Sequence, residues 1–304
     1  MIMKMKRLTY IAALLLSVIC ASCGKNDRIY DVSAAERTQE KLDLYRTALT
    51  DRGTWVMEYF PDEQLRYGGW IYVLEFRTDN IVKAWFEGAG FIPQENPVTE
   101  SEYAVDLGTG PMLRFVTNND YLHFFSFPGG PNGGGYQGWG GDHEFTFMSI
   151  SEERDEIVLR GLKSHNRIRL YPLPEGLTPE QYIGQVHESV LRPAKTQYDL
   201  CINGKVIGTA TREANPELDN FRKYYGSKVW VLRYNDGDDI VRGSLCSINL
   251  PDGVMRLYEP YAFRGNSVEG LDGRTVGEFR WTSGVFPSLD YYSGTDSFYQ
   301  ITLQ

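Results

Sequence analysis

The fold is decided by the stretch Trp70-Ile71-Tyr72-Val73-Leu74-Glu75-Phe76-Arg77, whose side chains alternate with a period of two. The aromatic and aliphatic residues at positions 70, 72, 74 and 76 share one face of an extended chain, while Glu75 and Arg77 share the other. This alternation predicts a half-buried β-strand. Thr78-Asp79-Asn80 supplies turn residues and residues 81–87 return as the partner strand, so the stretch predicts an antiparallel hairpin.

Short segments of the same kind continue on both sides of this hairpin. The period of two begins at Thr54, and further strands are expected at residues 102–107, 112–117, 121–127, 143–150, 156–161, 166–171, 197–203, 206–210, 228–234, 240–250, 274–281 and 298–303. Closely spaced short strands joined by turns are typical of antiparallel sandwiches and barrels. The sequence therefore predicts a mainly β fold with sandwich or barrel-like sheets.

Two helices interrupt the strands, one at the N-terminal end of the fold and one near the middle of the chain. The first is expected from Ser33 to Asp51, with Glu36 completing a capping box in which each side chain accepts a backbone N–H of the other residue. The second begins at Thr178, where Gln181 completes a similar box. Apolar residues at helical spacing predict that both helices dock on the β core.

The helices suggest how the chain is divided. Each precedes a set of strands, which predicts a helix plus first β subdomain at residues 33–174 and a helix plus second β subdomain at residues 175–304, with a shorter helix at 216–225. The two subdomains are expected to be similar, because the hairpin at 73–82 resembles the one at 231–241. One large domain is the alternative that the length leaves open.

The amino-acid composition favours a β fold, and the net charge limits the kinds of molecule that the protein is expected to bind. The chain has 304 residues, 13% of them aromatic, and 31 are glycine, a mixture that favours strands and turns. Its net charge is −9, and loss of an N-terminal signal would remove three basic residues and make it −12. Such a surface repels phosphate backbones and anionic headgroups, so nucleic acid is excluded as an expected partner.

The first 22 residues read as a lipoprotein signal peptide. Basic residues at positions 4, 6 and 7 precede an apolar run at 10–19, and Ala21-Ser22 places small residues directly before Cys23. The run is too short for a membrane span, which needs roughly 20 apolar residues. We therefore expect acylation of Cys23, a polar tether at residues 23–32 and membrane contact through the acyl chains.

Two further cysteines, Cys201 and Cys246, lie in segments that read as strands. An exported protein can form a disulfide between them. Two independent buried thiols are the other possibility, because free cysteine packs as a small hydrophobic residue. The sequence leaves the pairing open.

A glycine-rich stretch at residues 128–142 is the candidate ligand-binding segment. It contains eight glycines, which allow many backbone conformations, and it carries Tyr136, Trp139 and Asp142. Two aromatic rings on such a loop could stack on a sugar or on peptide side chains. The competing interpretation is a hairpin connection whose rings fold back onto the sheet, because glycine alone specifies no ligand.

Metal and catalytic motifs are not found in the sequence. His143 and His187 are each followed by Glu but lack a second histidine four residues on, so neither forms a zinc-protease face. His123 and His143 fall in phase with phenylalanines, which favours packing over metal binding. Residues 235–239 are rich in aspartate but are typical of a hairpin turn. We therefore predict no catalytic residues, no metal ligands and no cofactor.

The chain also resembles the Bacteroidetes lipoproteins grouped as domain-of-unknown-function family 4302. The resemblance rests on Ala35-Glu36-Arg37, residues 55–61 (Trp-Val-Met-Glu-Tyr-Phe-Pro), Tyr67-Gly68-Gly69, Gly110-Pro111, Leu113, Phe115, residues 136–142, Glu144-Phe145, Ile157, Leu159, Gly161, Lys163 and Pro172. It implies a lipoprotein associated with the outer membrane, on its periplasmic or cell-surface face, and accessory to nutrient-uptake loci. The family has no established catalytic residues to carry over.

These observations lead to one functional hypothesis and two rivals. The first is a lipid-anchored, non-catalytic protein that binds glycan or peptide for an outer-membrane transporter complex. The second is a secreted hydrolase of glycan or peptide whose carboxylates the sequence does not pair. The third is a structural or assembly lipoprotein.

Overall fold

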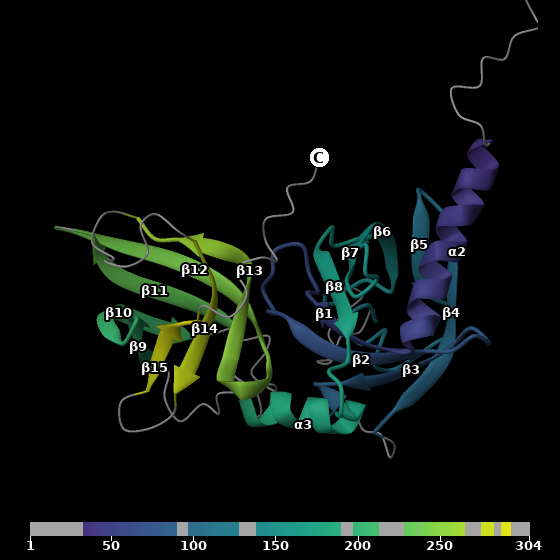
Figure 1. Ribbon diagram of the computed structural model, residues 1–304. Helices are drawn as coiled ribbons and strands as arrows, with labels where there is room; N and C mark the ends of the chain where they lie inside the picture. Colours follow the sequence, from purple (N-terminus) through teal and green to yellow (C-terminus); the bar gives the residue numbers. More distant parts are fainter. Residues whose placement is uncertain are drawn as a thin grey trace, which may run out of the picture. The chain divides into compact units, whose positions relative to one another are not determined.

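The computed structural model describes residues 33–89, 97–127, 138–189, 197–212, 228–236, 238–264, 275–282 and 287–292. The chain divides into two units, residues 1–41 and residues 42–304. Both sheets belong to the second unit, and each closes into a barrel (Figure 1). The predicted mainly β class with barrel-like sheets is therefore confirmed.

The first barrel consists of eight described strands that follow one another in chain order. All neighbouring strands are antiparallel, and the pairing of β1 with β8 closes the barrel. The strands are β1 (Thr54–Tyr59), β2 (Trp70–Phe76), β3 (Ile81–Phe86), β4 (Thr99–Leu107), β5 (Pro111–Phe115), β6 (Glu144–Ile150), β7 (Ile157–Gly161) and β8 (Arg167–Pro172).

Strand β2 is buried on both faces. Trp70 and Tyr72 lie in the core of the first barrel, whereas Ile71 and Val73 belong to a separate cluster that includes residues of the second barrel. Only Glu75 in this strand is partly exposed. The prediction of a half-buried strand is wrong, because the alternation within one strand does not reveal that another sheet will cover its second face.

Helix α2 (Ala34–Arg52) closes one end of the first barrel with its residues from Leu42 onward. The Tyr45 ring stacks on Phe147 with ring centroids 4.0 Å apart. The Trp55 indole N–H donates to the carbonyl of Leu49 at 3.0 Å. These contacts hold the helix against the end at which β1 begins.

The opposite end of the barrel is filled by residues 119–127. The sequence predicts a strand at 121–127, but the structure shows successive turns there, so this prediction is wrong. The Asn119 side-chain oxygen accepts the backbone N–H groups of Tyr121 (3.0 Å) and Leu122 (3.1 Å), which favours a turn over a strand. The Phe125 ring then lies 5.8 Å from that of Tyr59, at the end of β1.

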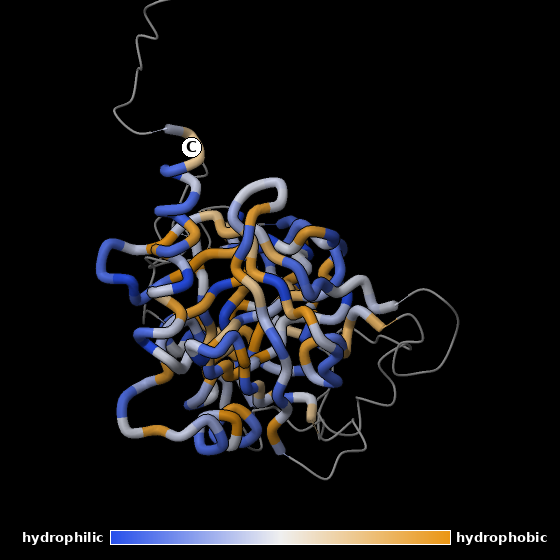
Figure 2. Tube along the Cα trace, turned by 90° about the vertical axis from the view of Figure 1, so that its right-hand side faces the viewer, coloured by the Kyte–Doolittle hydropathy of each residue, from blue (hydrophilic) through white to orange (hydrophobic). Residues whose placement is uncertain are grey.

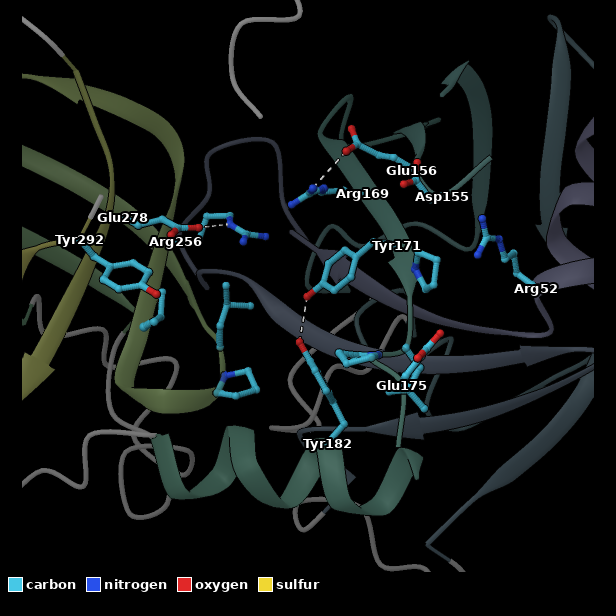
Figure 3. A pocket seen from close by; sticks show the side chains of 16 residues that line it. Arg52, Asp155, Glu156, Arg169, Tyr171, Glu175, Tyr182, Arg256, Glu278 and Tyr292 are labelled. Carbon is cyan, nitrogen blue, oxygen red and sulfur yellow. Dashed lines mark hydrogen bonds and ion pairs between the residues drawn. The ribbon is translucent and has the colours of Figure 1, made fainter. Parts of the chain in front are cut away.

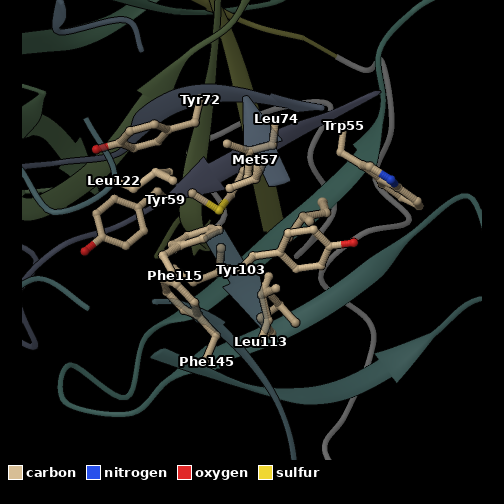
Figure 4. Packing of buried hydrophobic residues seen from close by; sticks show 14 of the residues in the cluster. Trp55, Met57, Tyr59, Tyr72, Leu74, Tyr103, Leu113, Phe115, Leu122 and Phe145 are labelled. Atoms are coloured by element: carbon tan, nitrogen blue, oxygen red, sulfur yellow. The ribbon is translucent and has the colours of Figure 1, made fainter. Parts of the chain in front are cut away.

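Aromatic side chains fill the interior between these two ends. Figure 4 shows Tyr59, Tyr72, Phe115 and Phe145 packed with aliphatic residues of the same cluster. The rings of Tyr59 and Tyr72 meet edge to face at 5.7 Å, an arrangement that aromatic quadrupoles favour. The inside of this barrel is therefore a packed core.

The second barrel consists of seven described strands, in which β15 runs parallel to β9 and closes the sheet. Its core is smaller and includes Leu232, Met255 and Phe279, all fully buried. The strands are β9 (Gln197–Ile202), β10 (Lys205–Arg212), β11 (Val229–Asp236), β12 (Asp239–Asn249), β13 (Val254–Ala262), β14 (Thr275–Thr282) and β15 (Ser288–Tyr291).

The sequence pattern does not predict strands β13 and β15. A short 3-10 turn, η3 (Pro251–Gly253), with Asp252 at φ 62°, reverses the chain between β12 and β13. Strand β15 has only four residues, and it is held in the sheet by pairing with β14 on one side and β9 on the other. The helix expected at 216–225 and the strand expected at 298–303 lie outside the described residues.

Helix α3 (Pro179–Ser189) packs in a third cluster shared by both barrels. Its predicted capping box is present, because Gln181 N–H donates to the Thr178 hydroxyl at 3.2 Å and Thr178 N–H donates to the Gln181 side chain at 2.8 Å. Val186 packs in this cluster with Val56 of β1 and Ile248 of β12. The second predicted helix is thus confirmed as an element packed between the sheets.

A buried ion pair also joins the barrels. Lys228 Nζ lies 2.6 Å from the Glu87 carboxylate, donates to the carbonyl of Gly69 at 2.7 Å and sits 4.0 Å from the Trp70 ring centroid. The second Glu87 oxygen accepts the N–H of Ile71 at 2.9 Å. Burial lowers the pKa of Lys228, and the nearby Glu87 carboxylate opposes that shift.

The distribution of hydrophobic and hydrophilic residues along the chain matches the two packed barrels. Figure 2 shows hydrophobic residues gathered along the inner parts of the trace and hydrophilic residues at the surrounding turns. In the part of the chain that is described, no helix combines the length and apolar character that crossing a membrane would require.

Candidate ligand-binding cleft

The structure places Trp139, one of the predicted ligand-binding residues, inside the first barrel. Its side chain is only 6% exposed, and its ring lies 4.7 Å from Tyr67 and 5.9 Å from Phe125. The ring folds back onto the core, as the competing interpretation of the glycine-rich stretch expects. Tyr136 lies outside the described residues.

Asp142, the third predicted residue, is a buried carboxylate that accepts hydrogen bonds from its own barrel. It accepts the backbone N–H groups of Lys163 and Ser164, the latter at 3.1 Å. Its backbone N–H donates to the Tyr59 hydroxyl at 2.7 Å. Trp139 and Asp142 thus fix the end of the barrel, and neither lines the cleft described below.

The other predicted positions are also located where they are described. Cys201 on β9 and Cys246 on β12 are free thiols, so of the two possibilities the structure has the unbridged one. Burial raises the pKa of both thiols. Cys23 lies outside the described residues, and its lipidation stays a prediction.

Histidines come together at one point. The rings of His123 and His143 lie 4.9 Å apart, while His187 bonds the carbonyl of Glu87 through Nε2 at 2.8 Å. Within the described ranges, no three or more His, Cys, Asp or Glu side chains are grouped so that they could hold a metal ion.

A polar cleft between the two barrels is the candidate site in the described part of the chain. It has a volume of about 740 Å³, inside the range of roughly 300–1,000 Å³ typical of ligand sites. Figure 3 shows its lining side chains. They are Arg52, Asp155, Glu156, Arg169, Tyr171, Pro172, Leu173, Pro174, Glu175, Tyr182, Leu250, Pro251, Val254, Arg256, Glu278 and Tyr292.

The wall on the first barrel presents an arginine paired with a carboxylate. Arg169 on β8 lies 3.0 Å from Glu156, which directly precedes β7. The Arg169 guanidinium also sits 5.0 Å from the centroid of the Tyr171 ring. Positions 169 and 171 project to the same side of β8 because strand side chains alternate, which places both in the cleft.

Two tyrosine hydroxyls meet at the centre of the cleft. Tyr171 of β8 and Tyr182 of α3 are 2.9 Å apart, oxygen to oxygen (Figure 3). Burial raises the pKa of both phenols well above the ordinary value. Both therefore keep their protons at neutral pH and can offer a hydroxyl to a ligand.

The wall on the second barrel is built around Arg256 of β13. Its guanidinium pairs with Glu278 of β14 at 2.6 Å and with Glu58 of β1 in the first barrel. Burial alone would lower the pKa of Arg256, but Glu58, Tyr171 and Glu278 together raise it. This one side chain therefore stays charged and ties the wall of the cleft to both barrels.

Tyr292 completes this wall just beyond β15. Its backbone N–H donates to the carbonyl of Glu278 at 3.1 Å. The guanidinium of Arg280 lies 4.4 Å from the centroid of its ring. The ring is thus held in place beside Arg256 and Glu278.

The sequence pattern does not predict this cleft, and none of the predicted ligand-binding residues that the structure describes lines it. Its residues come from α2, β8, α3, η3, β13, β14 and the chain beyond β15. No local motif joins these residues, and the sequence pattern does not predict β13. The closest available signal is the alternation of Arg169 and Tyr171 along one strand, which indicates a polar, aromatic face on β8.

Comparison with known proteins gives one match. A family model described as a domain of unknown function, DUF4302, matches residues 26–268. No protein with a curated description and no solved structure matches the chain.

Proposed function

Because this chain belongs to the DUF4302 family, whose description assigns no function, we propose a function from the cleft itself. The protein is a non-catalytic binding protein that holds a polar ligand, glycan or peptide, between its two barrels. An acyl chain on Cys23 anchors it to the outer membrane, where it serves a nutrient-uptake system.

The observation that carries this proposal is the arrangement of polar groups in the cleft. Arg256, Glu278, Arg169 and Glu156 are fixed in ion pairs at 2.6 and 3.0 Å, and the Tyr171 hydroxyl is fixed by that of Tyr182. Side chains already held in place lose little conformational entropy when a ligand binds. A preorganised polar cleft of this size supports binding.

The same pairs favour binding over hydrolysis. Glycoside cleavage requires one carboxyl group that keeps its proton to act as the acid. The acid must direct its carboxyl group at the leaving-group oxygen, whereas Glu156 and Glu278 in the described cleft are each engaged by an arginine guanidinium. The hydrolase therefore remains the rival, and release of reducing ends or new peptide termini during incubation would favour it.

The binding proposal is tested by blocking the cleft. Glu175 is an exposed lining residue, so Glu175→Trp should fill the space without disturbing the core. Glu188→Trp, at an exposed position of α3 that does not line the cleft, is the matched control. The lipidated protein in detergent is titrated with neutral oligosaccharides and with tryptic casein peptides. Binding that is lost in Glu175→Trp and kept in Glu188→Trp supports the site; equal binding by both variants contradicts it.

The anchor is tested separately. Metabolic labelling with a fatty-acid probe should mark the parent protein and leave Cys23→Ala unlabelled. The variant should also leave the membrane fraction, because one acyl-bearing residue provides the expected attachment. Unchanged fractionation of Cys23→Ala would overturn the proposed location. Capture of a transporter from native membranes by the parent tests the proposed uptake role.

A further inference from the structure

We infer that the ligand of the inter-barrel cleft is a neutral glycan, and that Tyr171 and Tyr292 supply the ring surfaces on which it lies. This inference rests on the proposed binding function and specifies its ligand class. Four properties of the described cleft lead to it: its charge balance, the pairing of its strands, the kind of hydrogen-bonding groups that it presents, and its ring and proline surfaces.

Charge balance argues against an anionic ligand. The described lining carries Arg52, Arg169 and Arg256 together with four carboxylates, Asp155, Glu156, Glu175 and Glu278. Glu58 lies behind Arg256 and adds a further negative charge. A uronic-acid or sulfated chain would meet a slight excess of negative charge, and like charges in a desolvated cleft are repelled.

Strand pairing argues against an extended peptide. Peptides commonly bind by adding a strand to a sheet edge, where main-chain hydrogen bonds supply the affinity. Strand β8 is already paired with β1 and β7. Strand β13 is paired with β12 and β14. At Arg169 and at Arg256 the wall strands are paired on both sides, so these two positions offer side chains and not a free strand edge to the ligand.

The hydrogen-bonding groups suit sugar hydroxyls. Each hydroxyl both donates and accepts, and each wall presents a guanidinium donor next to a carboxylate acceptor, Arg169 with Glu156 and Arg256 with Glu278. The Tyr171–Tyr182 hydroxyl pair between them can also act in either direction. A neutral polyhydroxy chain can satisfy both kinds of group without leaving a charge unpaired.

Ring and proline surfaces complete the match. Tyr171 and Tyr292 belong to opposite walls, and an arginine packs over each ring at 5.0 and 4.4 Å. Pro172, Pro174 and Pro251 add rigid apolar surface to the lining. The C–H faces of pyranose rings pack on such flat apolar surfaces, while their hydroxyl edges reach the paired charges.

The test compares three ligand classes on the lipidated protein in detergent by titration calorimetry. The probes are neutral oligosaccharides (maltoheptaose, cellohexaose, xylohexaose, mannohexaose), oligogalacturonate, and tryptic casein peptides. We expect a neutral oligosaccharide to bind, to be excluded by Glu175→Trp, and to change little in affinity between roughly 0.05 and 0.5 M salt because no net charge is neutralised.

Two variants of one residue test the ring. Tyr292→Ala should weaken binding of the neutral oligosaccharide about tenfold, which corresponds to about 1.4 kcal/mol, because the ring surface on which the sugar lies is lost. Tyr292→Phe keeps the ring and should stay within about twofold of the parent. Circular dichroism of both variants confirms that each is folded.

The outcomes separate this inference from the function on which it rests. Binding of peptide or oligogalacturonate that Glu175→Trp abolishes would overturn the neutral-glycan assignment and leave the binding function standing. Neutral-glycan binding that survives Glu175→Trp would overturn the assignment of the cleft. Neutral-glycan binding that Tyr292→Ala leaves unchanged would overturn the role of the ring. No binding by any of the three classes would contradict the proposed function itself.

Discussion

Gly68 lies where the connection between β1 and β2 meets Lys228 of the second barrel. Its φ is +69°, and a Cβ added there would lie 2.3 Å from the Cβ of Lys228. Both the left-handed backbone and the absence of a side chain are therefore required at this position. The ion pair between Lys228 and Glu87 depends on this close approach.

We predict that Gly68→Ala lowers the free energy of unfolding by about 2–5 kcal/mol, combining left-handed strain with overpacking. Gly176→Ala is the matched control, because Gly176 has φ +80° but nothing within 4 Å of its added Cβ. Gly176→Ala should lower the free energy of unfolding by only about 1–2 kcal/mol. Urea unfolding of both variants measures the difference, and equal losses would contradict the clash.

His123 is the residue whose titration should affect stability. It faces the His143 ring, the backbone of Asn119 and Phe115, and the charge of Asp120. Burial, followed by repulsion from His143, lowers the pKa of His123 below its ordinary 6.5. The segment that it belongs to fills one end of the first barrel.

We predict that acidification below pH 6.5 destabilises the protein through this residue. Above that pH, His123 is neutral in both states; below it, the unfolded chain binds the proton first, so folded stability falls until the folded-state pKa is passed. Urea unfolding measures the free energy of unfolding at about pH 7.5 and at about pH 5.5. The decrease between the two pH values should be smaller for His123→Gln than for the parent. His165→Gln, at an exposed position, is the control and should keep the parental loss.

At the scale of elements, α3 is the piece that joins the two sheets. Its capping box holds the first turn, and the Trp85 indole N–H of β3 donates to Glu180 in that turn at 2.7 Å. The same helix carries Tyr182 into the cleft. Fraying at the start of α3 should therefore affect both stability and the site.

We predict that Thr178→Ala destabilises the protein by about 1 kcal/mol, because the Gln181 N–H loses its acceptor at the helix start. Thr178→Ser keeps a hydroxyl at the same position and should lie within a few tenths of a kcal/mol of the parent. Chemical denaturation compares the two, and a loss equal to that of Thr178→Ala in the serine variant would show that the methyl group, not the cap, is responsible.

At the scale of the whole molecule, the described parts of the two barrels share an apolar cluster and the two buried ion pairs below. Lys228 with Glu87 and Arg256 with Glu58 each join a residue of one barrel to a residue of the other. Breaking a buried pair by removing one partner costs about 3–5 kcal/mol, because the other charge stays buried. The two sheets are therefore expected to unfold together.

We predict one calorimetric transition for the parent and two for the double variant Lys228→Met with Arg256→Met. Lys228→Met alone should lower the free energy of unfolding by about 3–5 kcal/mol, because the Glu87 carboxylate stays buried without its partner. Adding Glu87→Gln removes that charge and should recover part of the loss. Differential scanning calorimetry checks the number of transitions. A single transition in the double variant would mean that the apolar cluster alone couples the barrels.

The sequence by itself determined the secondary structure of several elements whose pattern is local. The period of two between residues 70 and 76, and the capping boxes at Ser33 and Thr178, reappear as β2, α2 and α3. These signals depend on residues within a few positions of one another. The mainly β class and the family followed from them and from the motifs around residues 55–61.

Only the tertiary structure decided which surfaces are covered and which form a site. Ile71 and Val73 form a second buried face, and Trp139 lies in the core of the first barrel. The cleft gathers Arg169, Arg256 and Tyr292 from segments far apart in the chain. The physical reason is that alternation within a strand encodes which residues share a face, whereas the partner of that face depends on how the sheets close and pack.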